Sequence, residues 1–323
     1  MQAAIVKQLG QAPSPGERPE PQPTPGRTLV RVTAASINPV DLHISSGTHP
    51  AGPPPLGHVP GVEGVGTVVA GGSLPAGTRV RVAVLGGYQD GTFAELVSAP
   101  DAACVPLPDG LDDGLAAAVG IVGVSALIAL RDEAGLRPGE SVLVLGATGG
   151  FGQALVHLAR ELGAGRVVAA GRTPARLAAL ADRTDGTLLL EPDAAAEEPS
   201  WFASRLERLG GPVDVVVDTL WGAYAPLALA ALRSGGRYLN LGQTAGSPAP
   251  VDAALLRHGG LRLSGFSAAA LPPERVVDAY REVAGIAARG ALDLPLAEYP
   301  LAEVGAAWAA QGASPGAKIV LRP

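Results

Sequence analysis

Hydrophobic and polar residues alternate along several short stretches of the first hundred positions, which is typical of strands with one face toward water. Residues 29–34 alternate in this way, and residues 78–84 repeat the pattern, with arginines predicted to point outward and valines inward. Residues 91–97 form a further candidate strand. Six prolines between positions 13 and 25 exclude a central strand there and predict an extended surface loop.

The pattern changes near Asp112, where a long apolar run over residues 115–130 predicts a buried helix. Residues 141–145 form a short apolar run, typical of a parallel strand buried on both faces. Apolar residues at helical spacing over 153–162 predict a helix that ends at Gly163. Further strands are predicted at residues 167–170, 187–190, 213–217, 238–241 and 261–264. This alternation of strands and helices predicts an α/β fold with a doubly wound parallel sheet.

The last part of the chain does not continue this alternation. Two helices, at residues 274–289 and 301–311, precede a terminal strand at 318–321, which we expect to return to the first domain. The predicted organisation is therefore discontinuous. Residues 1–115 and 267–323 form a β-rich substrate domain, and residues 116–266 form the domain with the doubly wound sheet.

Composition narrows the class of protein. A chain of 323 residues that is 47% hydrophobic and 17% charged suits a globular protein of two domains. The net charge of -6 forms no basic stripe, so a nucleic-acid partner is not expected. The chain opens on a strand-like segment rather than a signal segment, and its longest apolar run is short for a spanning helix, so no membrane partner is expected. The single cysteine, Cys104, excludes an internal disulfide, and we expect a cytoplasmic protein.

A glycine-rich segment follows the apolar strand at 141–145 and opens the helix after it. Its predicted cofactor-binding residues are Ala147, Thr148, Gly149, Gly150, Phe151 and Gly152. Glycines here allow a tight turn and close approach of a pyrophosphate to backbone N–H groups at the positive end of a helix. The context therefore predicts a Rossmann dinucleotide site, and a glycine turn without any ligand is the alternative.

The end of the second strand indicates which dinucleotide binds. A carboxylate there would accept a hydrogen bond from the ribose hydroxyl of NAD. The chain instead has Gly171, Arg172 and, four positions later, Arg176. Guanidinium groups bind a 2′-phosphate, so we predict NADPH as the cofactor, with solvated surface arginines as the alternative.

Several motifs together resemble the medium-chain dehydrogenase/reductase superfamily, and specifically its zinc-independent, quinone oxidoreductase-like branch. The segment at 36–41 resembles the branch's N-P-x-D motif, and residues 60–66 resemble its P-G-x-E-G-x-G signature. The glycine segment and the strand ending in Asp218 add to the match. The resemblance covers nearly the whole chain and implies a Rossmann domain with a GroES-like β-rich substrate domain.

The resemblance also implies that no metal is bound. The positions of the catalytic zinc ligands are matched here by Asn38, Val62 and Ile121, and the two aliphatic side chains cannot coordinate zinc. The turn at 86–91 is too short for the four-cysteine structural lobe of zinc-bearing relatives. His43, His49 and His58 lie close in sequence, but their spacing matches no common zinc pattern.

Family members carry residues near the nicotinamide or the substrate at positions matched here by Asn38, Ser125, Gly242, Gln243 and Phe266. Asp218 is included with the cofactor-binding set. His43 and His49 stand where relatives often carry a tyrosine that donates a proton, and either imidazole could donate one near neutral pH. A pocket-shaping role for His43, a surface-loop role for His49 and ordinary strand ends at Gly242 and Phe266 are the alternatives.

Without a Lewis acid, the remaining chemistry is delivery of hydride to an acceptor that is already electrophilic. The sequence therefore predicts an NADPH-dependent reductase of a small-molecule quinone or α,β-unsaturated carbonyl. An enoyl-thioester reductase of a biosynthetic pathway and a non-enzymatic NADPH-binding sensor or structural protein are the alternatives. The resemblance further implies a homodimer, for which the strand at 261–264 offers an edge.

Overall fold

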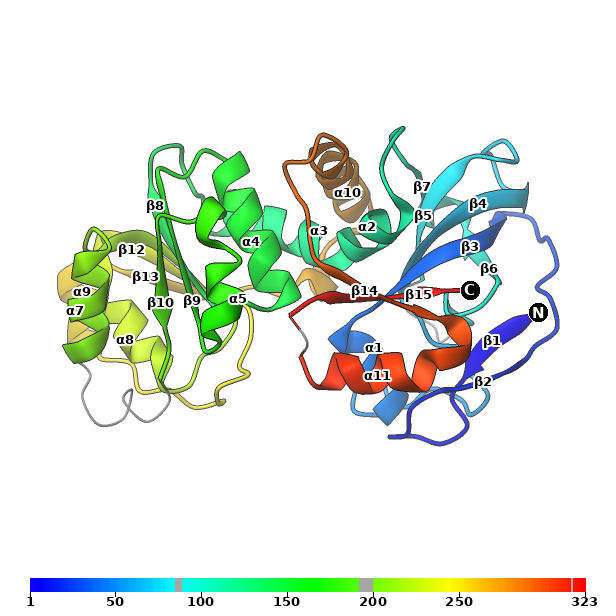
Figure 1. Ribbon diagram of the computed structural model, residues 1–323, viewed down its shortest axis with the longest axis horizontal. Coiled ribbons are helices and arrows are strands. Elements are labelled where there is room, and N and C mark those ends of the chain that lie inside the picture. The colour runs from blue at the N-terminus through cyan, green and yellow to red at the C-terminus, as the bar shows by residue number, and fades with distance from the viewer. Residues whose placement is uncertain (85–88, 192–199, 315) are drawn as a thin grey trace. The chain divides into compact units, whose positions relative to one another are not determined.

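A computed structural model describes residues 1–84, 89–191, 200–314 and 316–323, which divide into two compact units (Figure 1). The terminal unit comprises Met1–Val122 and Pro272–Pro323, and the central unit comprises Gly123–Leu271. The boundaries predicted from the sequence fall slightly earlier in the chain. The short turn predicted at 86–91 lies partly outside the described residues.

The central unit is built on a parallel sheet of order β10-β9-β8-β11-β12-β13. Its strands are β8 (Ser141–Leu145), β9 (Arg166–Gly171), β10 (Gly186–Leu189), β11 (Val213–Asp218), β12 (Leu232–Asn240) and β13 (Arg262–Gly265). The chain runs outward from β8 to β10, then crosses to β11 and runs outward the other way. This reversal confirms the predicted doubly wound sheet, and it places a switch point where β8 and β11 lie side by side.

Helices cover both faces of this sheet. Figure 1 shows α4 (Gly150–Glu161) and α5 (Pro174–Ala178) on one face, with α7 (Ser200–Arg208), α8 (Tyr224–Ala230) and α9 (Ala253–Gly259) on the other. Every residue of β8 is buried, because helices cover the strand from both sides. Helix α4 begins three residues before its predicted start, since the fingerprint glycines belong to its first turn.

Strand β13 ends the sheet. It pairs with β12 in parallel register, and each of its four residues is exposed. An exposed edge of this kind can pair with another strand. The homodimer contact predicted at this edge stays a prediction.

The terminal unit contains a mixed sheet of order β14-β15-β3-β4-β5-β7, with β6 also paired to β3, and a separate β1-β2 ribbon. Its strands are β1 (Gln2–Ile5), β2 (Ser14–Glu17), β3 (Arg27–Ile37), β4 (Glu63–Gly71), β5 (Arg79–Ala83), β6 (Leu96–Pro100), β7 (Cys104–Pro106), β14 (Leu296–Pro300) and β15 (Lys318–Arg322). The long strand β3 pairs with β6 through its first half and with β15 through its last residues. Its register shifts beside β4 let one strand serve these partners.

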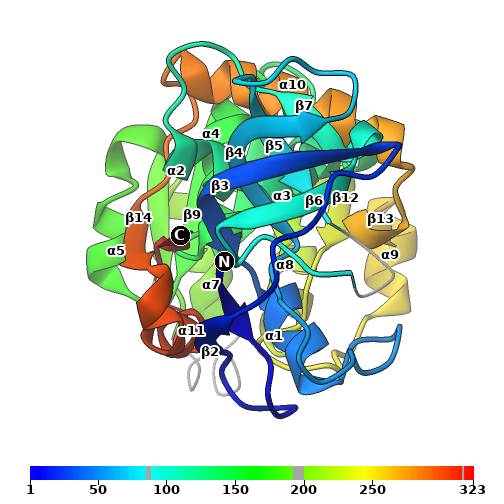
Figure 2. The same cartoon turned by 90° about the vertical axis from the view of Figure 1, so that its right-hand side faces the viewer.

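The end of the chain returns to this sheet, as predicted. Figure 1 shows β15 beside β3, although these strands come from opposite ends of the sequence, and β14 pairs with β15 on its other side. Figure 2 shows the same unit after a turn of 90°. The helices of the unit are α1 (Pro39–Ser46), α2 (Asp113–Ala118), α10 (Pro273–Ala288) and α11 (Val304–Gly312). The apolar run at 115–130 is helical and largely buried, as expected, but it is split into α2 and α3 (Gly120–Ile128), which crosses the division between the units.

Three local predictions for the terminal unit were wrong. Arg81 points inward rather than outward, because its guanidinium pairs with the buried carboxylate of Glu63. Part of the proline-rich segment forms β2, an edge strand in which proline is tolerated. The strand expected at 91–97 begins only at Leu96, since Gly91 crosses Gly61 so closely that a Cβ at Gly91 would lie 2.3 Å from the Gly61 oxygen.

Across the described ranges, no helix is both long enough and apolar enough to cross a membrane.

Candidate functional site

The glycine segment of the central unit forms a tight turn between β8 and α4. Gly146 has a φ of 83°, and the N–H groups of Gly146 and Ala147 donate to the oxygen of Ala170 on β9. A Cβ at Gly152 would lie 2.1 Å from the Gly146 oxygen. The turn therefore requires glycine at both positions for its own geometry, and Gly146 rather than Ala147 supplies the left-handed residue.

Gly149 differs, because the protein itself leaves room for a side chain there. A Cβ at this position would meet nothing closer than the Gly146 oxygen, at 3.7 Å. Gly149 is the N-cap of α4, so no side chain at the cap satisfies the first amides of the helix. Thr148, Gly150 and Phe151 complete this half-buried rim. Open space in front of unsatisfied amides at a positive helix end is what an anionic group such as pyrophosphate requires.

The next strand, β9, ends at Gly171 beside this turn. A Cβ at Gly171 would lie 2.8 Å from the Thr148 methyl group, so glycine lets the two segments approach. Arg172 follows and is exposed, and no described residue bonds to it. Arg176 is exposed on α5. The described chain places no carboxylate among the first residues after β9, which leaves cations to face a ligand there.

Asp218, at the end of β11, forms several hydrogen bonds within the protein. It is fully buried and accepts hydrogen bonds from the N–H groups of Leu220 and Trp221 and from the Tyr238 hydroxyl at 2.5 Å. Burial and the neighbouring carboxylate raise the pKa of Tyr238, so the phenol keeps its proton and donates. Trp221, with a φ of 58°, is held in a left-handed conformation by these bonds. The sequence placed Asp218 with the cofactor-binding residues, but its carboxylate is already engaged in shaping the β11–α8 turn.

The other residues predicted near the nicotinamide lie at the ends of β12 and β13 or on α3. A Cβ at Gly242 would lie 2.8 Å from the Thr219 oxygen, so glycine keeps this turn close to the β11 turn. Gln243 is exposed, and the Phe266 N–H donates to the Asn240 oxygen at 3.0 Å, continuing the β12–β13 pairing. Ser125 is largely buried on α3.

The terminal unit contains a buried group of charges that we call the Glu63 cluster: Asn38, Asp41, Glu63, Arg81 and Lys318. Each of these side chains is at most 4% exposed. The Glu63 carboxylate accepts from Arg81 Nη2 at 3.1 Å, Asn38 Nδ2 at 2.9 Å and the Ile121 N–H at 2.8 Å. Lys318 Nζ donates to Asn38 Oδ1 at 2.6 Å. The Glu63 cluster thus contains two carboxyl groups and two basic groups, together with the Asn38 amide.

Asp41 links this cluster to the signature segment. Its oxygens accept from the N–H groups of Asn38 at 2.8 Å and Val62 at 3.0 Å. Burial raises the pKa of Asp41 to about 7, although these two N–H groups and Lys318 partly oppose the rise. Burial likewise lowers the pKa of Lys318, an effect that the Glu63 and Asp41 carboxylates partly offset. A buried carboxyl group is therefore close to its titration point at neutral pH.

The two candidate histidines lie in different cavities. His49 shares a small enclosed cavity of about 60 Å³ with Asp41, His58 and Val62. His43 is exposed and lines a separate cavity of about 240 Å³ beside Trp308 of α11. The separation arises because α1 ends at Ser46 and the left-handed Gly47, with a φ of 77°, turns the chain before His49.

The sequence analysis did not predict the buried cluster that Asp41, Glu63, Arg81 and Lys318 form with Asn38. Asp41 and Glu63 were present within the two quoted motifs, and Lys318 is one of only two lysines in the chain, so signals existed for these three. Arg81 had no such signal, since alternation alone assigns a polar residue to the wet face of a strand. Asn38 is placed beside Asp41, as the motif implies, but all its side-chain groups are used within the cluster.

The described ranges contain no group of three or more His, Cys, Asp or Glu side chains that could hold a metal ion. Val62 and Ile121 contribute only backbone N–H groups near the Glu63 cluster, where each donates to a carboxylate.

Two family models match the chain. The alcohol dehydrogenase GroES-like domain matches residues 24–109, and the zinc-binding dehydrogenase model matches residues 193–321. Among solved structures, the quinone oxidoreductase from Thermus thermophilus, also solved in complex with NADPH, is 31% identical with a TM-score of 0.79, and each chain covers 100% of the other. A mycobacterial quinone oxidoreductase is 26% identical with a TM-score of 0.86, again covering 100% of both chains.

Polyketide synthases are similar to the chain over part of their length. The phenolphthiocerol synthesis polyketide synthase type I of Mycobacterium marinum is 34% identical over 219 residues, or 68% of this chain and 10% of the synthase. The chain therefore spans about a tenth of that relative.

Asp41→Asn is expected to change how stability depends on pH. The pKa of Asp41 is raised in the folded state from its ordinary value of 3.8 to about 7, so the folded protein holds this proton more tightly than the unfolded chain. The resulting stabilisation is fully present below about pH 4 and is lost as the pH rises to 7. Urea unfolding across this range should give a flatter profile for Asp41→Asn than for the wild type. Asp182→Asn, at an exposed position, is the control. Equal slopes in the wild type and Asp41→Asn would contradict the assignment.

Proposed function

The chain belongs to the medium-chain dehydrogenase/reductase superfamily, in its quinone oxidoreductase-like branch, and from this premise we propose that it reduces a quinone or an α,β-unsaturated carbonyl with hydride from NADPH. The single observation that carries the proposal is the open turn at Gly149, where a helix start without a side-chain cap lies beside an arginine-bearing strand end. The family makes the chain an oxidoreductase, and the acceptor is our inference.

NADPH is the cofactor that the residues fit. The amides around Gly149 would receive the pyrophosphate, and Arg172 with Arg176 would bind the 2′-phosphate. Two solved relatives with full coverage have been captured with NADPH, which supports the same choice. Gly242, Gln243 and Phe266, at the neighbouring strand ends, would approach the nicotinamide through their backbone.

The acceptor follows from the residues at the positions of the zinc ligands in relatives. Val62 and Ile121 have aliphatic side chains, and the Asn38 amide is held by Glu63 on one side and Lys318 on the other. These positions therefore supply no Lewis acid to stabilise the alkoxide of a simple alcohol. An acceptor whose carbon is already electrophilic needs none, which favours quinones and enones.

The reduced acceptor must then take up a proton. Hydride addition leaves negative charge on the acceptor oxygen, and a neighbouring acid stabilises it by donating. We assign this role to His49 rather than His43, because His49 shares its cavity with Asp41 and Val62. Asn38 acts through the Glu63 cluster as a positioning residue, and Ser125 remains our candidate hydrogen-bond donor to the substrate.

An enoyl-thioester reductase is the second candidate, which the similarity to polyketide synthases favours. A non-enzymatic NADPH-binding protein is the third. Both candidates would bind NADPH at the same turn. The second would reduce an enoyl thioester, and the third would reduce no acceptor.

Steady-state oxidation of NADPH separates these functions. We expect turnover with a benzoquinone or a small enone, none with a short enoyl-CoA, and no loss of rate after treatment with a chelator. Turnover confined to the enoyl-CoA would replace the first proposal by the second. Tight NADPH binding without turnover of either acceptor would favour the non-enzymatic function.

Arg172→Ala should raise the Michaelis constant for NADPH while leaving that for NADH nearly unchanged. A charge-assisted hydrogen bond contributes roughly 1.5–3 kcal/mol, so the expected increase is about 10- to 150-fold. Arg208→Ala, at an exposed position on α7, is the control. Equal increases in the Michaelis constants for NADPH and NADH would contradict the assignment of the 2′-phosphate to Arg172.

Replacing the two histidines one at a time tests the proton donor. His49→Gln should lower kcat by about 100-fold or more, the range of general acid catalysis, and should flatten the pH profile of kcat. His43→Gln should leave kcat within a few-fold of the wild type. The opposite result would move the acid role to His43.

A further inference from the structure

The central unit has a second polar cavity at the end of its sheet opposite the cofactor turn. It has a volume of about 270 Å³, and its lining includes Arg137, Arg237, Arg262 and Glu133. Arg137 precedes β8, whereas the glycine turn follows that strand, so these two segments lie at opposite ends of β8. We propose that this cavity binds a phosphate-class anion, at a site separate from the cofactor.

Strand register brings two of the arginines together. Arg237 of β12 and Arg262 of β13 are direct partners in the parallel ladder, so their side chains leave the same face of the sheet. Like charges directly opposite each other on neighbouring strands are destabilising. Glu140 offsets this cost only at Arg237, so an anion beside Arg262 would reduce it further, whereas a neutral ligand would not.

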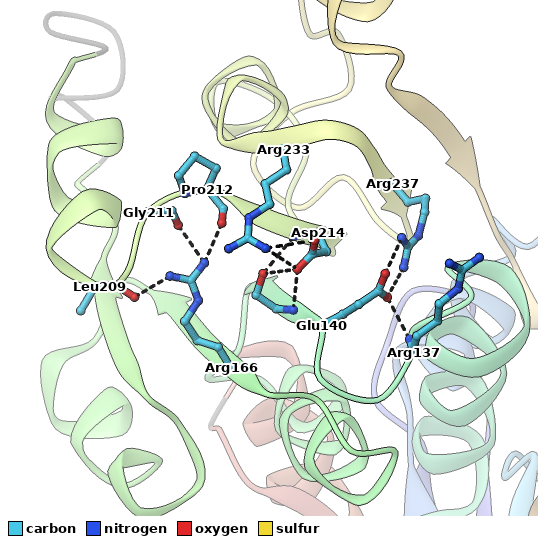
Figure 3. A network of polar contacts seen from close by, with 10 residues as sticks. Arg137, Glu140, Arg166, Leu209, Gly211, Pro212, Asp214, Arg233 and Arg237 are labelled. Atoms are coloured by element: carbon cyan, nitrogen blue, oxygen red, sulfur yellow. Dashed lines mark hydrogen bonds and ion pairs between the residues drawn. The ribbon is translucent and has the colours of Figure 1, made fainter.

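The carboxylates near the cavity do not neutralise all three of its arginines, Arg137, Arg237 and Arg262. The guanidinium of Arg237 donates to both oxygens of the Glu140 carboxylate (Figure 3). It also donates to the backbone oxygens of Ala134 and Gly135. Arg137 gives Glu140 only its backbone N–H, and no described residue bonds to its guanidinium (Figure 3).

Arg262 is exposed, and its guanidinium likewise donates to no described residue. Glu133 is the one carboxylate among the described lining residues, and one carboxylate cannot neutralise both of these arginines. Two guanidinium groups thus remain available to a ligand in the cavity.

The geometry of the donors selects the class of anion. Two uncommitted guanidiniums present paired N–H donors, which match the oxygens of a phosphate or pyrophosphate. A dianion can use both groups, while a single carboxylate satisfies only one. The source of the anion, a free phosphate or the phosphate of a larger metabolite, shares this chemistry.

Titration calorimetry with inorganic pyrophosphate tests the site. The Arg137→Gln/Arg262→Gln protein should bind at least about tenfold more weakly than the wild type, and added salt should weaken wild-type binding. The Arg137→Lys/Arg262→Lys protein should recover part of the affinity, because it keeps the charge without the fork. Arg208→Gln is the matched control for loss of one exposed cation.

Because the arginines of the proposed cofactor site could also bind pyrophosphate, the same titration is run with Arg172→Gln/Arg176→Gln. Binding that survives in this variant supports the second site. Binding that is lost in it but unchanged in Arg137→Gln/Arg262→Gln would overturn the proposal, as would no binding to the wild type. None of these results depends on NADPH turnover, so the proposed function fails or stands separately.

Discussion

A carboxylate buried away from bulk solvent needs hydrogen-bond donors from the protein, and the terminal unit is organised around this requirement at Glu63. Its donors come from distant parts of the chain: Arg81, Asn38 and the backbone of Ile121. Arg81 also stacks over the ring of Tyr280 on α10, at 4.9 Å from the ring centroid. Removing one member of a buried pair leaves a charge uncompensated, at a cost of about 3–5 kcal/mol. Glu63 and Arg81 therefore connect strands and helices of the terminal unit that lie far apart in the sequence.

The cofactor turn of the central unit is formed by residues that are close together in the sequence, so more of this unit could be predicted from the sequence. The glycine turn, its strand and its helix are consecutive, so their geometry follows from residues within one short stretch. The doubly wound sheet likewise follows from the order of strands and helices along the chain. The bond between Asp218 and Tyr238 could not be predicted from the sequence, because Tyr238 lies on the next strand and only the folded sheet brings the phenol to the carboxylate.

The terminal unit could be predicted less well, because its site is assembled from residues far apart in sequence. Alternation assigned Arg81 to solvent, since no local signal reveals a buried carboxylate on the adjacent strand. The rarity of lysine marked Lys318, but its partner could not be predicted, because only the pairing of β15 with β3 brings its ammonium to Asn38. The cavities of His43 and His49 could not be predicted from the sequence, because one left-handed glycine after α1 turns the chain between them.

The two bonds of the Asn38 amide also bear on how a chain of this kind can evolve. A cysteine at this position would deprive Lys318 of its acceptor and Glu63 of a donor in one step, before any ligand existed at Val62 or Ile121. Such a substitution would therefore destabilise the buried cluster before it could contribute to a metal site. Asn38, Glu63 and Lys318 are expected to change together rather than one at a time.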